Sequence, residues 1–425
     1  MYVAVFRIFS VLLAVMAISS RAESRAIVIP SLPRDFSNVD IYLGTRDIGH
    51  EVYSKYGHTI VRIVNHENRS DIGYNWGTFD FYEPGYILKF IKGILIYRMS
   101  YGPWNDEIEV SQFENQTTWM ERVNLTTKQK EILVKRINWQ AQPENAKYPY
   151  RFFYDNCSTR VRDFFDEALG GRIKARTSKR MSGKTYRDRV LEHNASEPML
   201  AMGQDVILNS EPDQEMSQWD DMFIPIRLRD YLMEMQAIDD NNQEIPGLKL
   251  LSDTEVITNF PRPETPIFNG FFLVCFIAGV PALLGVIFVK LENLKKLGIR
   301  FIGLANIALG VQWSFFGLFM ILQWAFGGHS VAVHNANLWL MWPLDFLYVI
   351  AGFKLLRGRF LDPASKFYQL MFRVTSSHLI GIGMLMVGQW THLISQDTSR
   401  VVVYFVPLTA LVFCIAIMPL RLLKK

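Results

Sequence analysis

Residues 152–165 read FFYDNCSTRVRDFF, and the predicted fold depends on the change from extended chain to helix within this stretch. Asp155 and Asn156 are residue types that cap helix N-termini, so they predict a helix that begins at Cys157. Apolar residues then recur at helical spacing as far as a glycine pair at 170–171, which is typical of a helix end. The cysteine therefore opens a helix that directly follows an aromatic, extended segment.

Short stretches rich in β-branched and aromatic residues precede this helix and predict strands. They lie at 38–45, 59–65, 71–76, 94–101 and 117–125, and 148–154 is extended and aromatic as well. Residues 83–93 resemble a short helix, and Thr126 with Gln129 has the spacing of a capping box at the start of a longer one. This order predicts an α+β domain, an antiparallel sheet with packed helices.

The ends of the chain indicate export and membrane insertion. Residues 1–23 have a basic residue, Arg7, and then a short apolar run, as in a secretory signal peptide. Five later segments are long and apolar enough to be predicted as spans, at 268–289, 301–326, 337–353, 377–395 and 401–420. We therefore expect a signal peptide at 1–23, an exported α+β domain at 24–251, a proline-rich linker at 252–266 and an all-α domain of five spans at 267–425.

Basic residues set the expected orientation. Lys and Arg are frequent in the loops 290–300 and 354–375 and in the C-terminal tail. The loops on the other side, 327–336 and 396–400, contain a single Lys or Arg residue, Arg400. Basic loops stay in the cytoplasm, so we expect a cytoplasmic C-terminus and an exported N-terminal domain. The net charge of +4 is small and lies mainly beside the apolar segments, which does not favour nucleic acid as a partner.

Cys157 is the only cysteine of the expected exported domain, because Cys275 and Cys414 fall within predicted spans. A thiol in the first turn of a helix has a lowered pKa, and free N–H groups there can hold an oxyanion. We expect Asn156, Ser158 and Arg160 to contribute to the substrate or oxyanion site around this thiol. The alternative is a buried, inert cysteine.

A cysteine nucleophile needs a base, and His58 is the best placed of the exported histidines because it follows Gly57 and opens a predicted strand. The next strand offers Asn75 or Asp80 to orient the imidazole, and we favour Asn75. A purely structural, hydrogen-bonded His58 is the alternative. Spacing does not favour a metal site, and we expect no metal and no cofactor.

The motifs YSKYGHTIVRI (53–63) and YDNCSTRVRDFF (154–165), with YNWGTFDF (74–81) between them, resemble the bacterial lacto-N-biosidase-type N-terminal periplasmic domain family. That family also has a polytopic C-terminal membrane region. The order of histidine and cysteine is remotely similar to circularly permuted papain-like enzymes of the NlpC-like and lecithin:retinol acyltransferase-like groups. This resemblance implies a permuted papain-like fold with Cys157 as nucleophile, His58 as base and Asn75 or Asp80 as orienting group.

The resemblance implies a location in the bacterial inner membrane with a periplasmic N-terminal domain. The resulting hypothesis is a membrane-anchored cysteine hydrolase or acyltransferase that acts on an amide or ester of an envelope lipid, peptide or protein. The alternative is a non-enzymatic maturation factor or chaperone that binds through aromatic residues around Trp76, Tyr82 and Trp104.

Asp345 lies inside the third predicted span, and His378 inside the fourth. Acidic residues within a membrane are costly, so they mark functional sites or polar contacts between helices. His334 stands at the expected outer mouth of the third span. Contacts between helices are the simpler expectation for this group.

Overall fold

The computed structural model describes residues 31–79, 83–358 and 364–422. Two compact units share these residues. The first comprises residues up to Phe90, Ile94–Arg180 and Gln218–Arg262, and the second comprises Ile91–Gly93, Met181–Ser217 and the chain from Pro263 onward.

An antiparallel sheet organises the first unit, in the strand order β11-β5-β1-β2-β3-β4-β6. The strands are β1 (Val39–Arg46), β2 (His58–Asn65), β3 (Ser70–Thr78), β4 (Ile96–Pro103), β5 (Thr118–Val123), β6 (Lys147–Pro149) and β11 (Leu251–Thr258). The predicted α+β class with an antiparallel sheet is thus confirmed.

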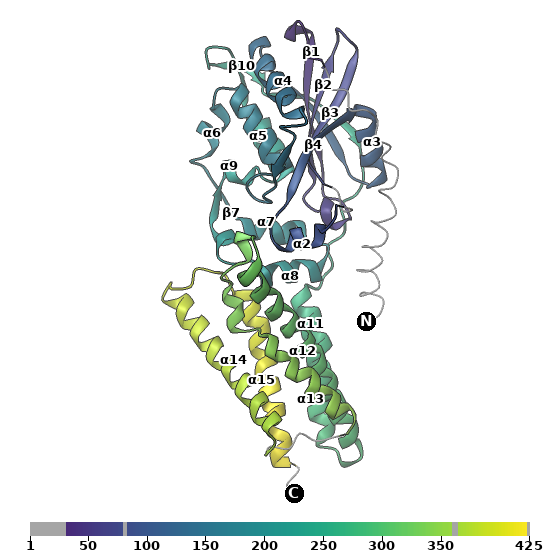
Figure 1. The fold of residues 1–425 in the computed structure, drawn as a ribbon, viewed down its shortest axis with the longest axis vertical. Helices are drawn as coiled ribbons and strands as arrows, with labels where there is room; N and C mark the ends of the chain where they lie inside the picture. The colour runs from purple at the N-terminus through teal and green to yellow at the C-terminus, as the bar shows by residue number, and fades with distance from the viewer. Residues whose placement is uncertain (1–30, 80–82, 359–363, 423–425) are drawn as a thin grey trace. The chain divides into compact units, whose positions relative to one another are not determined.

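Helices cover both faces of this sheet, with α4 (Thr127–Ala141) and α5 (Cys157–Ala168) on one side and α3 (Trp104–Phe113) on the other (Figure 1). Alternate residues of a strand point to opposite faces, and Val61 and Ile63 of β2 pack with α4 and α5 in the main core. Ile60 packs instead with Trp104 of α3. The unit also contains α6 (Arg172–Thr177), α9 (Gln218–Asp221), α10 (Pro225–Met233), β9 (Gln236–Ile238), β10 (Glu244–Lys249) and all of α2 (Tyr86–Ile91) except its last residue.

The helix starts follow the local sequence. Thr126 and Gln129 form a reciprocal capping box at α4, as their spacing predicts. Two successive glycines in the left-handed region, Gly170 at φ 63° and Gly171 at φ 83°, follow the end of α5. Only glycine adopts this conformation readily, so the pair stops the helix where the sequence indicated.

The predicted linker at 252–266 needs correction, because its first part is strand β11, which pairs with β5 from Leu251 to Thr258. The three prolines that suggested a linker lie after the strand, at 261, 263 and 266. The Arg262 guanidinium also donates to Asp47 Oδ2 at 2.6 Å, so the first unit continues to this residue.

Residues 181–217 were expected within the exported domain but belong to the second unit. They form β7 (Met181–Thr185), α7 (Tyr186–His193), α8 (Pro198–Ile207) and β8 (Glu215–Ser217). Asn209 Nδ2 donates to the carbonyls of Ser330 and Val333, both at 2.7 Å, and Asn335 Nδ2 donates to the carbonyl of Val206 at 2.9 Å. These hydrogen bonds join the segment to the loop after α12.

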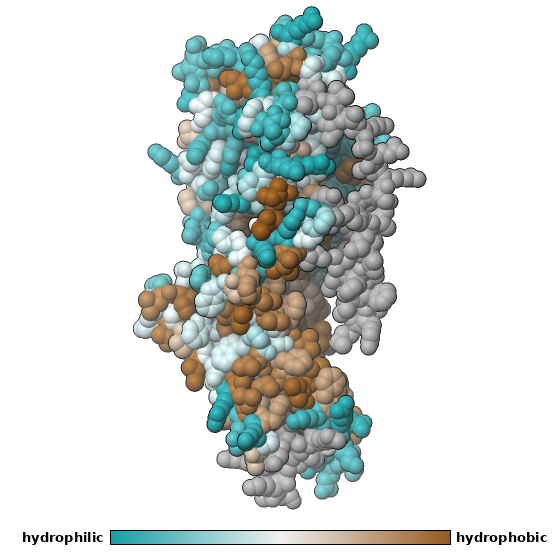
Figure 2. Space-filling view, in the orientation of Figure 1, coloured by the Kyte–Doolittle hydropathy of each residue, from teal (hydrophilic) through white to brown (hydrophobic). Residues whose placement is uncertain are grey.

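The rest of the second unit consists of apolar helices: α11 (Gly270–Val289), α12 (Lys295–Phe326), α13 (Phe346–Leu356), α14 (Lys366–Trp390) and α15 (Ser399–Leu422). Hydrophobic residues gather on the visible face of these helices (Figure 2). Within the described residues, three helical stretches are long and apolar enough to cross a membrane, Gly270–Val289, Glu292–Phe326 and Lys366–Trp390.

The third predicted span is broken, because Ser330–Trp339 and Pro343–Leu356 meet at an angle of 52° and count at most as one further span. Ser399–Ala410, the first half of α15, is a shorter apolar helix. The structure therefore supports three or four membrane-crossing helices, and a fifth span remains a prediction. The expected signal peptide lies outside the described residues.

Asp345 lies at the break, immediately before α13, and its Oδ1 is 2.7 Å from Nε2 of His378 on α14. Both side chains are fully buried, with an exposed fraction of 0%. The second carboxylate oxygen accepts the backbone N–H of Trp342 at 2.8 Å. This pair is the polar contact between helices that the sequence suggested.

Candidate active site

Cys157 is the first residue of α5, and the start of this helix is fixed by Asn156. Asn156 Oδ1 accepts the backbone N–H groups of Ser158 and Thr159, both at 2.9 Å. Thr159 Oγ1 accepts the N–H of Asn156 in return at 2.8 Å, which completes a capping box. The predicted position of the cysteine at a helix start is confirmed.

The side-chain amide hydrogens of Asn156 and the hydroxyl of Ser158 are also hydrogen-bonded. Asn156 Nδ2 donates to the carbonyls of Phe152 and Phe223, at 2.8 and 2.9 Å, and Ser158 Oγ donates to the carbonyl of Met222 at 2.6 Å. Both side chains are buried. This geometry gives Asn156 and Ser158 a structural role and does not favour the contacts with substrate that the sequence suggested.

The Arg160 side chain also contacts nearby residues, Asp155 and Tyr148. Its guanidinium makes two parallel bonds to Asp155, at 2.6 and 2.8 Å, and lies 3.7 Å from the centre of the Tyr148 ring. Bidentate carboxylate contact and stacking on an aromatic face both hold a guanidinium in one orientation. Arg160 therefore fixes Tyr148 against the first turn of α5.

The environment of the Cys157 thiol contains opposing influences. Backbone N–H groups of Thr59, Ser158 and Cys157 itself face the sulfur and favour the thiolate. Burial outweighs them and raises the pKa of Cys157 to about 11. The lowered pKa expected from the helix start is therefore wrong, because a helix terminus alone does not compensate for the loss of solvent around a charge. The resting thiol is protonated at neutral pH.

His58 opens β2, as predicted, after Gly57 in the left-handed region at φ 74°. A Cβ at position 57 would lie 2.4 Å from the carbonyl oxygen of Arg46, so glycine allows β1 and the start of β2 to approach closely. Burial, followed by the charge of Arg46, lowers the pKa of His58 to about 4. The imidazole is therefore neutral at pH 7 and available as a base.

Asn75 on β3 orients this imidazole, since His58 Nε2 lies 2.9 Å from Asn75 Oδ1. Asn75 Nδ2 donates to Glu107 Oε1 at 2.5 Å, which identifies the other amide atom as the acceptor. Nε2 must then carry the ring proton, and Nδ1 is the basic nitrogen. The sequence favoured Asn75 for this position, whereas Asp80 lies outside the described residues.

Glu107 and Arg46 extend the contact, and sequence reasoning missed both. Glu107 Oε2 binds Arg46 Nη2 at 2.5 Å, and both side chains are largely buried. The result is a continuous chain of contacts from His58 through Asn75 to an ion pair. Arg46 lies opposite His58 in the pairing of β1 with β2, and this could have indicated its proximity. The sequence alone does not give the register of the two strands.

The Cys157 sulfur, which belongs to α5, contacts β2 at the residue next to His58. The sulfur faces the N–H of Thr59, and His58 is the residue before it. His58 and Asn75 lie on the face covered by α3, whereas Cys157 packs with the core under α4 and α5. No hydrogen bond joins Cys157 to His58 in the described part of the chain.

The first two residues of β2 are paired with β1 but not with β3. Pairing between β2 and β3 stops at Ile60 and Asn75, although β3 continues to Thr78. The Cys157 sulfur and His58 are therefore associated with adjacent residues of β2, on the two faces of the sheet. Catalytic hydrogen bonds are often long in unliganded sites and tighten only with substrate.

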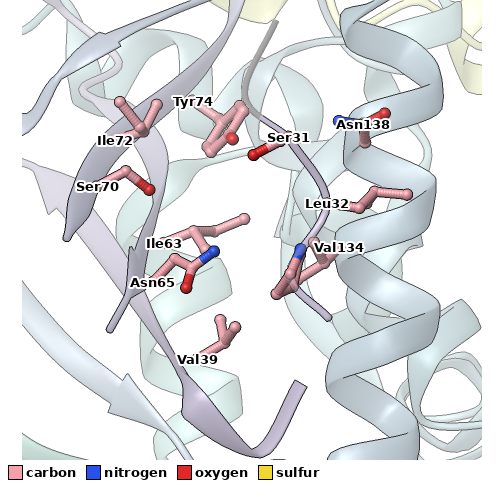
Figure 3. Close-up of a pocket in the computed structure, with 11 residues that line it drawn as sticks. Ser31, Leu32, Val39, Ile63, Asn65, Ser70, Ile72, Tyr74, Val134 and Asn138 are labelled. Atoms are coloured by element: carbon pink, nitrogen blue, oxygen red, sulfur yellow. The ribbon is translucent and has the colours of Figure 1, made fainter. Parts of the chain in front are cut away.

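Two other features lie away from this corner. Trp76 and Trp104, expected on a binding surface, are 0% and 4% exposed and belong to the cores, and Tyr82 lies outside the described residues. A pocket between β2, β3 and α4 (Figure 3) is lined in part by Asn65 and Asn138. Asn65 ends the strand that His58 begins, about 23 Å away at the usual rise per residue, so this pocket is separate from the thiol.

Comparison with known proteins gives one match. Residues 34–191 match the family model described as Lnb N-terminal periplasmic domain, and this range includes Cys157, His58 and Asn75. No curated protein and no solved structure matches the chain, so the similarity to permuted papain-like enzymes remains a prediction. The match over residues 34–191 therefore confirms the resemblance to this family that the sequence indicated.

Proposed function

We propose that this protein is a membrane-anchored periplasmic cysteine hydrolase or acyltransferase that acts on an amide or ester of an envelope component. The observation that carries the proposal is the 2.9 Å contact between His58 Nε2 and Asn75 Oδ1. It leaves a neutral Nδ1 at the start of β2, where the next N–H faces the sulfur of Cys157. In this proposal Cys157 is the nucleophile, His58 is the base and Asn75 is the orienting group.

The protonation states favour a base-assisted attack rather than a preformed ion pair. As Cys157 Sγ bonds to the carbonyl carbon, its proton moves to His58 Nδ1, and Asn75 Oδ1 stabilises the imidazolium that forms. The tetrahedral intermediate collapses to a thioester when the C–N or C–O bond breaks, and the leaving group takes the proton from His58. Water or an acceptor hydroxyl or amine then attacks the thioester and restores the thiol.

The second unit supplies the anchor in this proposal. Its long apolar helices would hold the first unit beside a bilayer, which favours substrates that are also attached to the envelope, whether lipid, peptide or protein. The basic loops favour an inner-membrane location with a cytoplasmic C-terminus. Alkaline phosphatase fused after Lys425 is expected to be inactive in the bacterial envelope, and an active fusion would contradict this orientation.

The proposal is tested with the full chain in detergent and p-nitrophenyl acetate as an acyl donor. Cys157 is expected to acquire an acetyl group, with release of p-nitrophenol, and the reaction is expected to disappear in Cys157→Ala. Cys275→Ala is the matched control, because its half-buried thiol lies in α11 and belongs to no proposed site. An unmodified Cys157 in the folded wild-type chain would remove the enzymatic proposal and leave the non-enzymatic maturation role.

A further inference from the structure

The start of α5 has few free donors for an oxyanion. The N–H groups of Ser158 and Thr159 are already bonded to Asn156 Oδ1. Acyl transfer at Cys157 develops negative charge on the carbonyl oxygen, and that charge needs preorganised donors. The N–H of Cys157 itself faces the sulfur, and a second donor would come from another element near the thiol.

Tyr148 on β6 has the required properties. Its side chain is 4% exposed, and within the described residues its hydroxyl has no partner that meets hydrogen-bond geometry. Buried hydroxyl groups are nearly always bonded, so an unpartnered one indicates either a cost to the fold or a missing ligand. Burial, and then a charge on Cys157, raises the pKa of Tyr148, so the hydroxyl keeps its proton and remains a donor.

Three contacts place the Tyr148 side chain between β3 and the first turn of α5. The Tyr148 ring lies under the guanidinium of Arg160, which is one turn after Cys157 on α5. Gly77 faces the same ring from β3, and a Cβ at that position would be 4.0 Å from the Tyr148 hydroxyl. The Gly77 N–H is directed at this hydroxyl as well. The Tyr148 hydroxyl therefore lies next to the first turn of α5, close enough to Cys157 for a charge on that residue to raise its pKa.

We propose that the Tyr148 hydroxyl donates a hydrogen bond to the substrate's carbonyl oxygen as Cys157 attacks, and so stabilises the tetrahedral oxyanion. This inference rests on the function proposed above. The bond forms between the hydroxyl proton and the developing oxyanion and is broken when the intermediate collapses, so Tyr148 returns to its initial state without net proton transfer. The substrate it recognises is a carbonyl compound, an ester, thioester or amide.

The test compares two reactions of the same thiol in the full detergent-solubilised chain. Acetylation of Cys157 by p-nitrophenyl acetate passes through an oxyanion, whereas alkylation by iodoacetamide does not. In Tyr148→Phe, acetylation is expected to slow about 100-fold, while alkylation stays within about twofold of the wild-type rate. Removing an unpaired buried hydroxyl is not expected to lower the melting temperature.

Tyr101→Phe is the matched control. The Tyr101 hydroxyl is likewise buried and without a partner among the residues described, and its ring packs against Tyr74 at 5.8 Å on β3. An equal acetylation rate in Tyr148→Phe and Tyr101→Phe would overturn the inference and leave the proposed function intact. Equal losses of acetylation and alkylation in Tyr148→Phe would also overturn it, because Tyr148 would then only position the thiol. No acetylation of the wild-type chain above that of Cys157→Ala would refute the proposed function and this inference together.

Discussion

His58 Nε2 lies 2.9 Å from Asn75 Oδ1, and the second amide atom of Asn75 is bonded to Glu107. The orientation of the amide thus fixes the tautomer of the imidazole, with the ring proton on Nε2 and the basic nitrogen at Nδ1. Nδ1 is then the ring nitrogen that can take up a proton. The predictions below follow from this relationship and from its surroundings.

Asn75→Ala is expected to reduce acetylation of Cys157 about 10–100-fold, because the imidazole loses the partner that sets its tautomer. The measurement is the rate of p-nitrophenol release by the solubilised chain. Asn65→Ala is the control, since Asn65 is also buried but lies at the far end of β2. An equal loss in both variants would point to general destabilisation instead of a role for Asn75 in orientation.

The pH dependence follows from the two shifted groups. The pKa of Cys157 is about 11, so iodoacetamide alkylation should rise about tenfold for each pH unit from 7 to 10. The pKa of His58 is about 4, so the base is unprotonated above that value, and acetylation should be lost only as pH falls through about 4. An alkylation rate that already levels off below pH 8 would indicate a preformed thiolate and contradict this account.

The cap of α5 gives a stability prediction. Asn156→Ala removes two hydrogen bonds to the helix start and leaves the carbonyls of Phe152 and Phe223 without their donor. The expected loss is about 2–4 kcal/mol in the free energy of unfolding, seen as a lower melting temperature of the solubilised chain. Asn145→Ala, at a partly exposed residue whose side chain has one bond to the carbonyl of Trp139, is expected to cost about 0.5 kcal/mol or less. Similar losses in the two variants would mean that the cap does not hold α5.

The buried pair in the helical unit is expected to behave as one interaction. His378→Ala leaves the Asp345 carboxylate with only the Trp342 N–H, so each single alanine variant should destabilise the unit strongly. The double variant should cost less than the sum of the two, with a coupling of about 0.5–3 kcal/mol in thermal unfolding. Asp345→Ala combined with Thr391→Ala, at the exposed end of α14, serves as the additive control. Strict additivity for Asp345 and His378 would show that they do not support each other.

Regular local patterns made much of the fold predictable. The strands that carry His58 and Asn75 and the capping box at Thr126 were all predicted from local spacing. The helix α3 was missed because it has almost no apolar stripe, with only Trp104 and Ser111 buried. It is held partly by the contact of Glu107 with Arg46, which no periodicity reveals.

The remaining errors have tertiary causes. Strand β11 lies at the edge of the sheet, so residues such as Glu255 and Val256 are exposed and the expected alternation is lost. The thiol pKa depends on the burial of Cys157, which the helix start alone does not determine. Asn156 and Ser158 were correctly placed beside the cysteine, but the partners that occupy them, Phe223 and Met222, lie more than 60 residues away in the chain.

The central claim is that His58 serves Cys157 as its base, and His58→Gln tests it most directly. Glutamine keeps a polar side chain of similar length but cannot take up the proton at neutral pH. Acetylation of Cys157 by p-nitrophenyl acetate at pH 7 is expected to fall about 100–10,000-fold in His58→Gln, with the melting temperature and the alkylation at pH 10 little changed. An acetylation rate equal to that of the wild-type chain would contradict the account.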